Sequence, residues 1–134
     1  MSGVNGMPRH RHIDGIAARR WKGYRRHRGA PEEGEPLKTT IITAYELLKG
    51  AASSSKPREN MRLVKEMLSN INILTLSYGA CEEASRIYVK LRRRGVVIGE
   101  FDLLIAAIAI HNDELLLSRD KHFKLIEELK IETW

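Results

Sequence analysis

Apolar runs typical of β-strands alternate with segments of helical spacing from residue 37 to the end of the chain. The strand-like runs are TTIIT (39–43), INILTL (71–76), ELLLSRD (114–120) and LKIETW (129–134). The helix-like segments cover residues 44–50, 58–69, 78–94 and 99–111. Strands that alternate with helices form mainly parallel sheets covered by helices on both faces. The pattern therefore predicts an α/β fold with a parallel sheet flanked by helices.

The segment at 78–94 illustrates how the helices are expected to pack. Its apolar positions recur at helical spacing, and Gly95 follows as a stop signal. The residues predicted to face inward are Ala84, Ile87, Tyr88 and Leu91.

Positive charge is concentrated near the N-terminus. The chain has 134 residues and a formal net charge of +6. Residues 9–28 hold eight Arg or Lys residues and one acid, whereas residues 29–134 hold fifteen bases and sixteen acids. The basic stretch has no clear periodicity and few large apolar residues, so it lacks the surface needed to offset the entropy of ordering. We expect a basic arm at 1–36, disordered or aberrant, and a domain at 37–134.

Composition also restricts the cellular setting. No apolar run reaches the ~18 residues that a membrane span needs, and no apolar segment follows the N-terminal basic residues as in a secretory signal. The chain has one cysteine, Cys81, which cannot form an internal disulfide. These features predict a cytoplasmic protein that does not bind membranes.

Three acidic residues lie at predicted element ends that the topology would bring to one edge of the sheet. Glu46 lies in the helix after TTIIT, Asp102 begins the helix before ELLLSRD, and Asp120 ends that run. In open parallel sheets, site residues gather beyond the carboxyl ends of the strands. Clustered carboxylates repel unless a cation is present, and hard divalent ions such as Mg²⁺ or Mn²⁺ take oxygen ligands. Such a site can activate water and hold a phosphodiester.

Three motifs in this order carry a family resemblance. TTIITAYELLKGA, GEFDLLIAAIAI and LLLSRDKHF, with LKIETW at the end, resemble a PIN domain of the VapC toxin type over residues 37–134. The resemblance implies a magnesium-dependent endoribonuclease of a type II toxin–antitoxin system. It implies a homodimer that is neutralised by a cognate antitoxin. It also implies that Glu46, Asp102 and Asp120 are catalytic metal ligands, supported by Ser118.

The first motif of the family is not evident. Family members open with an apolar central strand that ends in Asp-Thr-Asn or Asp-Thr-Ser, and its Asp is a principal metal ligand. The nearest counterpart is Asp14 in HIDGI, 32 residues before Glu46, but RHRH is a poor buried strand and Gly15 has no side-chain hydroxyl or amide. We therefore expect a PIN-like sheet whose first central strand is absent or divergent.

Two interpretations of the arm remain open. It is either a genuine replacement that binds RNA phosphates, or the product of a shifted or degraded reading frame upstream of about Pro36. The function has matching alternatives: a toxin nuclease that is active, weakened or inactive, or a non-catalytic PIN remnant that binds RNA or an antitoxin, using the basic arm. Arg119 and Lys121 flank Asp120 and are candidates for contacts with RNA phosphates.

Overall fold

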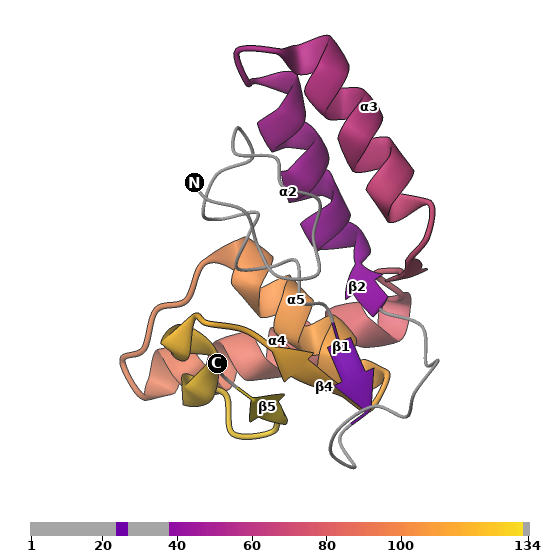
Figure 1. Cartoon of the computed structure of the whole chain (residues 1–134). Helices are drawn as coiled ribbons and strands as arrows, with labels where there is room; N and C mark the ends of the chain where they lie inside the picture. Colours follow the sequence, from indigo (N-terminus) through magenta and orange to yellow (C-terminus); the bar gives the residue numbers. More distant parts are fainter. Residues whose placement is uncertain (1–23, 27–37, 133–134) are drawn as a thin grey trace.

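The computed structural model describes residues 24–26 and 38–132 of the chain (Figure 1). Its helices are α2 (Ile41–Ala52), α3 (Pro57–Leu68), α4 (Tyr78–Arg93), α5 (Glu100–His111) and the short 3₁₀ helix η1 (Lys121–Leu125). Its strands are β1 (Tyr24–Arg26), β2 (Lys38–Thr40), β3 (Asn72–Leu74), β4 (Glu114–Leu117) and β5 (Ile131–Glu132). The predicted α/β fold is confirmed.

The five strands form one sheet in the order β3-β2-β1-β4-β5. The two outer pairs, β2 with β3 and β4 with β5, are parallel, as the sequence predicts. The central strand β1 runs antiparallel to both of its neighbours. Because β2 and β4 both oppose β1, they run in the same direction, and their carboxyl ends point to the same edge of the sheet. Strand β1 falls within the range 1–36, and the boundary of the arm stays a prediction.

The run TTIIT is divided between a strand and a helix, which differs from the prediction of one strand over 39–43. Strand β2 ends at Thr40, whose Oγ1 accepts a hydrogen bond from the backbone N–H of Thr43 at 3.0 Å. This N-cap satisfies a helical N–H group that would otherwise lack a partner, so α2 begins at Ile41. The helix continues past Gly50 to Ala52, two residues beyond its predicted end.

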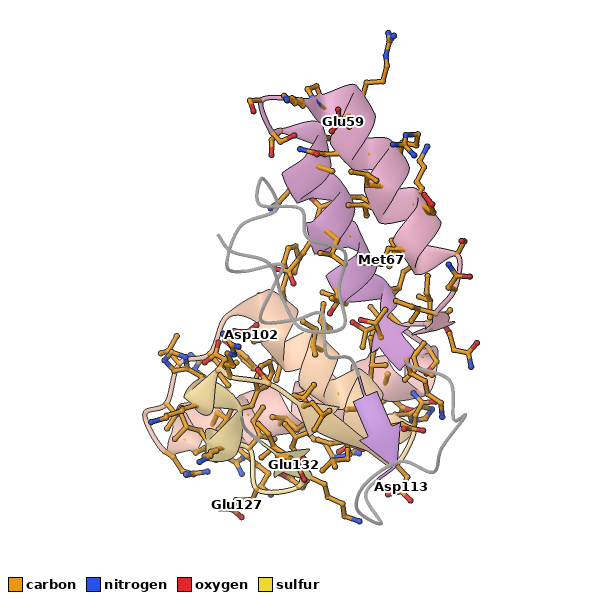
Figure 2. All side chains as sticks on the ribbon, in the orientation of Figure 1. Glu59, Met67, Asp102, Asp113, Glu127 and Glu132 are labelled. Atoms are coloured by element: carbon orange, nitrogen blue, oxygen red, sulfur yellow. The ribbon has the colours of Figure 1, made fainter. Side chains whose placement is uncertain are left out.

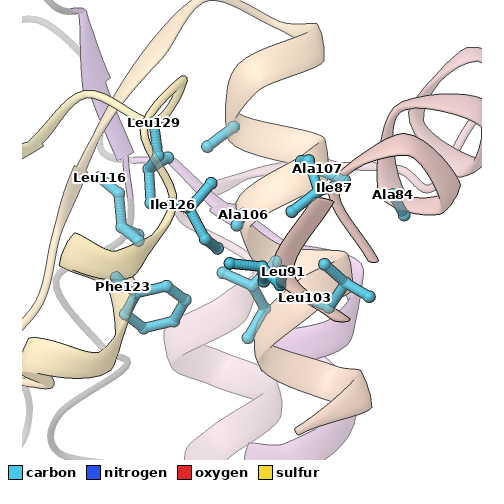
Figure 3. Close-up of a cluster of buried hydrophobic side chains, with 12 residues drawn as sticks. Ala84, Ile87, Leu91, Leu103, Ala106, Ala107, Leu116, Phe123, Ile126 and Leu129 are labelled. Atoms are coloured by element: carbon cyan, nitrogen blue, oxygen red, sulfur yellow. The ribbon is translucent and has the colours of Figure 1, made fainter. Parts of the chain in front are cut away.

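The main hydrophobic core lies between α4, α5, β4 and the C-terminal segment (Figure 3). Helix α5 contributes five of the twelve buried residues of this cluster, which explains why its sequence is apolar on nearly every side after the first turn. Helix α4 packs against α5, and its residues Ala84, Ile87 and Leu91 face the core, as predicted. The prediction for Tyr88 is wrong, because this side chain is exposed.

A second hydrophobic cluster joins α2 to α3. Its buried members are Ala44, Leu47, Ala51, Val64, Met67 and Leu68. The two helices form a hairpin that extends away from the sheet and from α4 and α5 (Figure 1). This α2–α3 hairpin therefore has a core of its own and contacts the rest of the fold mainly at the base of α2.

Strand β4 is buried along its whole length, and the chain beyond it is held by short backbone contacts. The N–H of Leu116 donates to the carbonyl of Lys130, and that of Ser118 donates to the carbonyl of Glu132. The predicted strand over 114–120 thus ends at Leu117, and Ser118 is fixed just past it. None of the described helices is long and apolar enough to cross a membrane.

Candidate active site

Glu46 lies in α2, six residues after the carboxyl end of β2. Its side chain is partly buried, and its Oε1 atom is buried. An α-helix rises about 1.5 Å per residue, so the Cα atom of Glu46 lies roughly 9 Å along the helix from the end of β2, and the side chain leans back toward the sheet. The N-cap at Thr40 sets the start of the helix and therefore sets where Glu46 lies.

Asp102 lies in the first turn of α5, where a negative charge is favoured by the helix dipole. Its side chain is partly buried, whereas that of Glu100 in the same turn is exposed. Figure 2 shows Asp102 at one end of α5 and Asp113 beyond the other end. The buried apolar residues behind Asp102 anchor the helix and hold this carboxylate at its outer end.

Asp120 is the N-cap of η1 and has a defined set of contacts. Its Oδ1 accepts a hydrogen bond from the backbone N–H of His122 at 3.0 Å and lies 2.7 Å from Nδ1 of the same residue. Its own N–H donates to Oγ of Ser118 at 3.0 Å. The Ser118 side chain is only 3% exposed, so it supports Asp120 from within the protein.

The topology relates these acids to one edge of the sheet. Helix α5 packs against β4 after the short turn at Asn112 and Asp113, so its N-terminal end lies near the carboxyl end of β4. Asp102 and Asp120 therefore belong to the same end of the α5–β4 unit. Helix α2 leaves the same edge of the sheet from the end of β2 and contacts α5.

A direct contact joins the two helices beside their acids. The ring of Tyr45, adjacent to Glu46, meets the ring of Phe101, adjacent to Asp102, edge to face at a centroid distance of 5.6 Å. Asp120 is held from its own segment, by Ser118 and His122. The contact between Tyr45 and Phe101 thus joins α2 to α5 next to Glu46 and Asp102.

The oxygen donors of Glu46, Asp102 and Asp120 suit a hard divalent cation by their chemistry. Within the described residues, however, no group of three or more His, Cys, Asp or Glu side chains is arranged to hold a metal ion. Asp14 lies outside the described residues, so its assignment stays a sequence prediction. Arg119 and Lys121 are exposed on either side of Asp120, where the sequence suggests contacts with RNA phosphates.

A family model decides the class of this domain. The model for the PIN domain matches residues 13–129 of the chain. The chain belongs to the PIN domain family. The match includes strands β1 to β4 and helices α2 to α5, as well as part of the range predicted as an arm.

Relatives of this PIN domain are of the VapC type. Ribonuclease VapC2 of Haemophilus influenzae is 32% identical over 94 residues, which cover 69% of this chain and 71% of the relative. The tRNA(fMet)-specific endonuclease VapC of Shigella flexneri is 28% identical over the same shares of the two chains. A crystal structure of VapBC2 from Rickettsia felis, bound to a DNA fragment from its promoter, has a TM-score of 0.71 at 28% identity. It covers 76% of this chain and 77% of that chain.

Sequence reasoning missed two contacts in the site of this PIN domain. The contact between Tyr45 and Phe101 depends on where α2 begins, and the β-branched run predicts a strand at that point. With α2 beginning at Ile41, the spacing of Ile41, Tyr45 and Lys49 by four residues predicts a common face. The contact of His122 with Asp120 depends on η1, and the pattern RDKHF carries no signal for that geometry.

Proposed function

We propose that this PIN domain is the ribonuclease toxin of a type II toxin–antitoxin pair, and that it cleaves RNA with Mg²⁺ or Mn²⁺ as cofactor. One observation carries the proposal: Asp102 and Asp120 lie at the same end of the α5–β4 unit. The chain that holds them has VapC ribonucleases among its relatives. Glu46 is the third acid of the proposed site.

The chain's own residues have distinct roles in this proposal. Asp102 and Asp120 would hold the cation, and Glu46 would hold either the cation or a water molecule beside it. Ser118 positions Asp120 by accepting its backbone N–H, and His122 restricts the Oδ1 atom of the same carboxylate. The bound ion would lower the pKa of a coordinated water and stabilise charge on the phosphate.

Contacts outside the acidic residues complete the proposal. Arg119 and Lys121 would bind phosphates of the RNA, with the salt dependence typical of such contacts. A cognate antitoxin is proposed as a partner because the similar solved structure from Rickettsia felis is a VapBC complex. We also propose that the protein acts as a homodimer.

The test compares two substitutions in the same helical turn. Asp102→Asn and Glu100→Gln each remove one negative charge from the first turn of α5, so both weaken the helix dipole interaction to a similar degree. RNA cleavage by the full chain is measured with Mg²⁺, with Mn²⁺ and with EDTA. We expect cleavage that needs the metal, is lost in Asp102→Asn and persists in Glu100→Gln. Circular dichroism checks that both variants are folded.

Calorimetric titration of Mn²⁺ provides a readout independent of turnover. Asp102→Asn should weaken Mn²⁺ binding about tenfold or more, whereas Glu100→Gln should not. Metal-independent cleavage, or equal loss in both variants, would contradict the proposal. Salt-sensitive RNA binding without cleavage, weakened when the basic residues of 9–28 are replaced by Gln, would instead support the non-catalytic alternative.

A further inference from the structure

An exposed group of two aromatic rings and one ammonium lies next to the proposed site. We call Tyr45, Lys49 and Phe101 the aromatic–lysine cluster. The rings of Tyr45 and Phe101 are 5.6 Å apart and nearly perpendicular, at 88°. The Nζ atom of Lys49 lies 5.5 Å from the Tyr45 centroid and 5.8 Å from the Phe101 centroid. The ammonium therefore rests against both rings, in the distance range of cation–π contacts.

Both rings keep part of their surface open to solvent. Tyr45 is 49% exposed and Phe101 is 38% exposed, and neither belongs to the main core or to the core of the α2–α3 hairpin. Ile41, one helical turn before Tyr45, is exposed as well. Exposed aromatic surface beside a cation is a combination that proteins use for contact with nucleic acid bases and phosphates.

The position of the cluster relates it to the proposed site. Tyr45 precedes Glu46 in α2, and Phe101 precedes Asp102 in α5, so each ring leaves the backbone one residue from a candidate catalytic acid. Consecutive residues of a helix point in different directions, so the rings lie beside the acids rather than on the same face. There the base of a neighbouring nucleotide can reach the rings while its phosphate lies at the acids. The cluster also offers both groups that a nucleotide requires, an aromatic surface for the base and a positive charge for the phosphate.

We propose that the aromatic–lysine cluster binds an unpaired nucleotide of the RNA beside the cleaved bond. This inference rests on the proposed ribonuclease function. A paired base in a helix has both faces covered by its neighbours, so only an unpaired base can stack on Tyr45 or Phe101. The cluster therefore selects single-stranded or looped RNA, and Lys49 contributes one phosphate contact.

Binding is measured with the full chain in EDTA, which prevents metal-dependent cleavage. The probe is a short single-stranded oligoribonucleotide that carries 2-aminopurine, whose fluorescence changes when the base stacks. Tyr45→Ala and Phe101→Ala should each weaken binding roughly 5- to 150-fold, the range for loss of one base–aromatic stack. Lys49→Met should make log affinity fall less steeply with log salt, by the amount that one phosphate contact contributes to the slope. The same RNA as a duplex should bind more weakly to the unmodified protein and be insensitive to the ring substitutions.

The chain offers matched controls. Tyr88 is 47% exposed, close to the value for Tyr45, but lies on α4, so Tyr88→Ala should leave RNA affinity unchanged. Lys65→Met removes an exposed cation from α3 in the same way. Cluster variants that bind the single-stranded probe as well as these controls would overturn the inference.

Two further outcomes are informative. The first would show that the cluster is a contact between copies of the chain, and the second would separate failure of the ribonuclease proposal from failure of the nucleotide site. If the ring variants retain RNA affinity but lower the molecular mass in analytical ultracentrifugation, the cluster joins two copies, and the inference fails. If the unmodified protein does not cleave RNA with Mg²⁺ but the ring variants bind the probe more weakly, the ribonuclease proposal fails while the nucleotide site stands.

Discussion

The ammonium of Lys38 lies 2.6 Å from Oε1 of Glu114, and strand β1 lies between the two strands that carry them. Lys38 is on β2 and Glu114 is on β4, so this ion pair connects the two parallel halves of the sheet across its central strand. The Glu114 side chain is 7% exposed and that of Lys38 is 19% exposed. Such a pair has a large cost when only one partner is removed.

Lys38→Met should destabilise the protein by about 3 kcal/mol, because it leaves the buried Glu114 carboxylate without its ammonium. The double variant Lys38→Met with Glu114→Met removes both charges and should recover most of this loss. Urea denaturation of the two variants measures the difference. Equal stability of Lys38→Met and the unmodified protein would show that the pair does not hold the sheet together.

Gly79→Ala should also destabilise the protein, for a steric reason. A Cβ atom at this position in α4 would overlap Cε1 of His111, at the end of α5. His111 is exposed and its ring can turn away, so the cost should stay below the ~1–3 kcal/mol of overpacking in a closed core. Adding His111→Ala removes the clash and leaves the higher helix propensity of Ala, so the double variant should be more stable than Gly79→Ala alone. A double-mutant cycle by thermal denaturation checks this coupling.

Ser118→Ala should lower both stability and cleavage, since the Asp120 N–H then loses its acceptor. We expect a loss of about 1 kcal/mol in unfolding free energy. On the proposed function, we also expect slower cleavage, because Asp120 is less well positioned. Ser85→Ala is a suitable control, because the Ser85 hydroxyl is exposed and donates to a carbonyl within its own helix. A result in which Ser118→Ala behaves like Ser85→Ala would remove Ser118 from the site.

The Lys90–Glu128 pair predicts a specific dependence on pH. The hydrogen bond from Lys90 holds the pKa of the Glu128 carboxyl below the usual value for glutamate. A carboxyl with a lowered folded-state pKa adds stability above its unfolded pKa and loses it as the pH falls through the folded value. Glu128→Gln should therefore unfold at a slightly lower temperature at neutral pH, and the difference should disappear in acid. This loss should be smaller than that of Lys38→Met, because the pair is exposed.

Sequence patterns predicted the helices of this fold well because their apolar spacing and stop signals are local. Helix α4 ends at Arg93, and Gly95 has a φ of 72°, a conformation that glycine adopts without strain. The strands were predicted too long, since an apolar run does not reveal where a side chain begins to cap a helix. Thr40 shows this, because its hydroxyl ends β2 in the middle of a β-branched run.

Part of the candidate site could be predicted because the order of the elements is readable from local sequence patterns. The positions of Glu46, Asp102 and Asp120 after strands or at helix starts follow from element order, which the sequence conveys. The direction of β1 does not follow, because three residues of a basic segment carry too little pattern to orient a strand. The contact of Tyr45 with Phe101 joins residues 56 positions apart, and only the packing of α2 on α5 brings them together.

The two separate hydrophobic cores have a mechanical consequence for the site. Glu46 belongs to the α2–α3 hairpin, whereas Asp102 and the segment after Asp120 are fixed to the main core. A tilt of the hairpin about its base near Thr40 would change the separation of Glu46 and Asp102. Such a tilt is opposed by Ile42, which packs on the main core, and by the contact of Tyr45 with Phe101. The spacing of Glu46 and Asp102 is therefore set at the junction of α2 with α5, and substitutions at this junction, rather than inside the hairpin core, should change it.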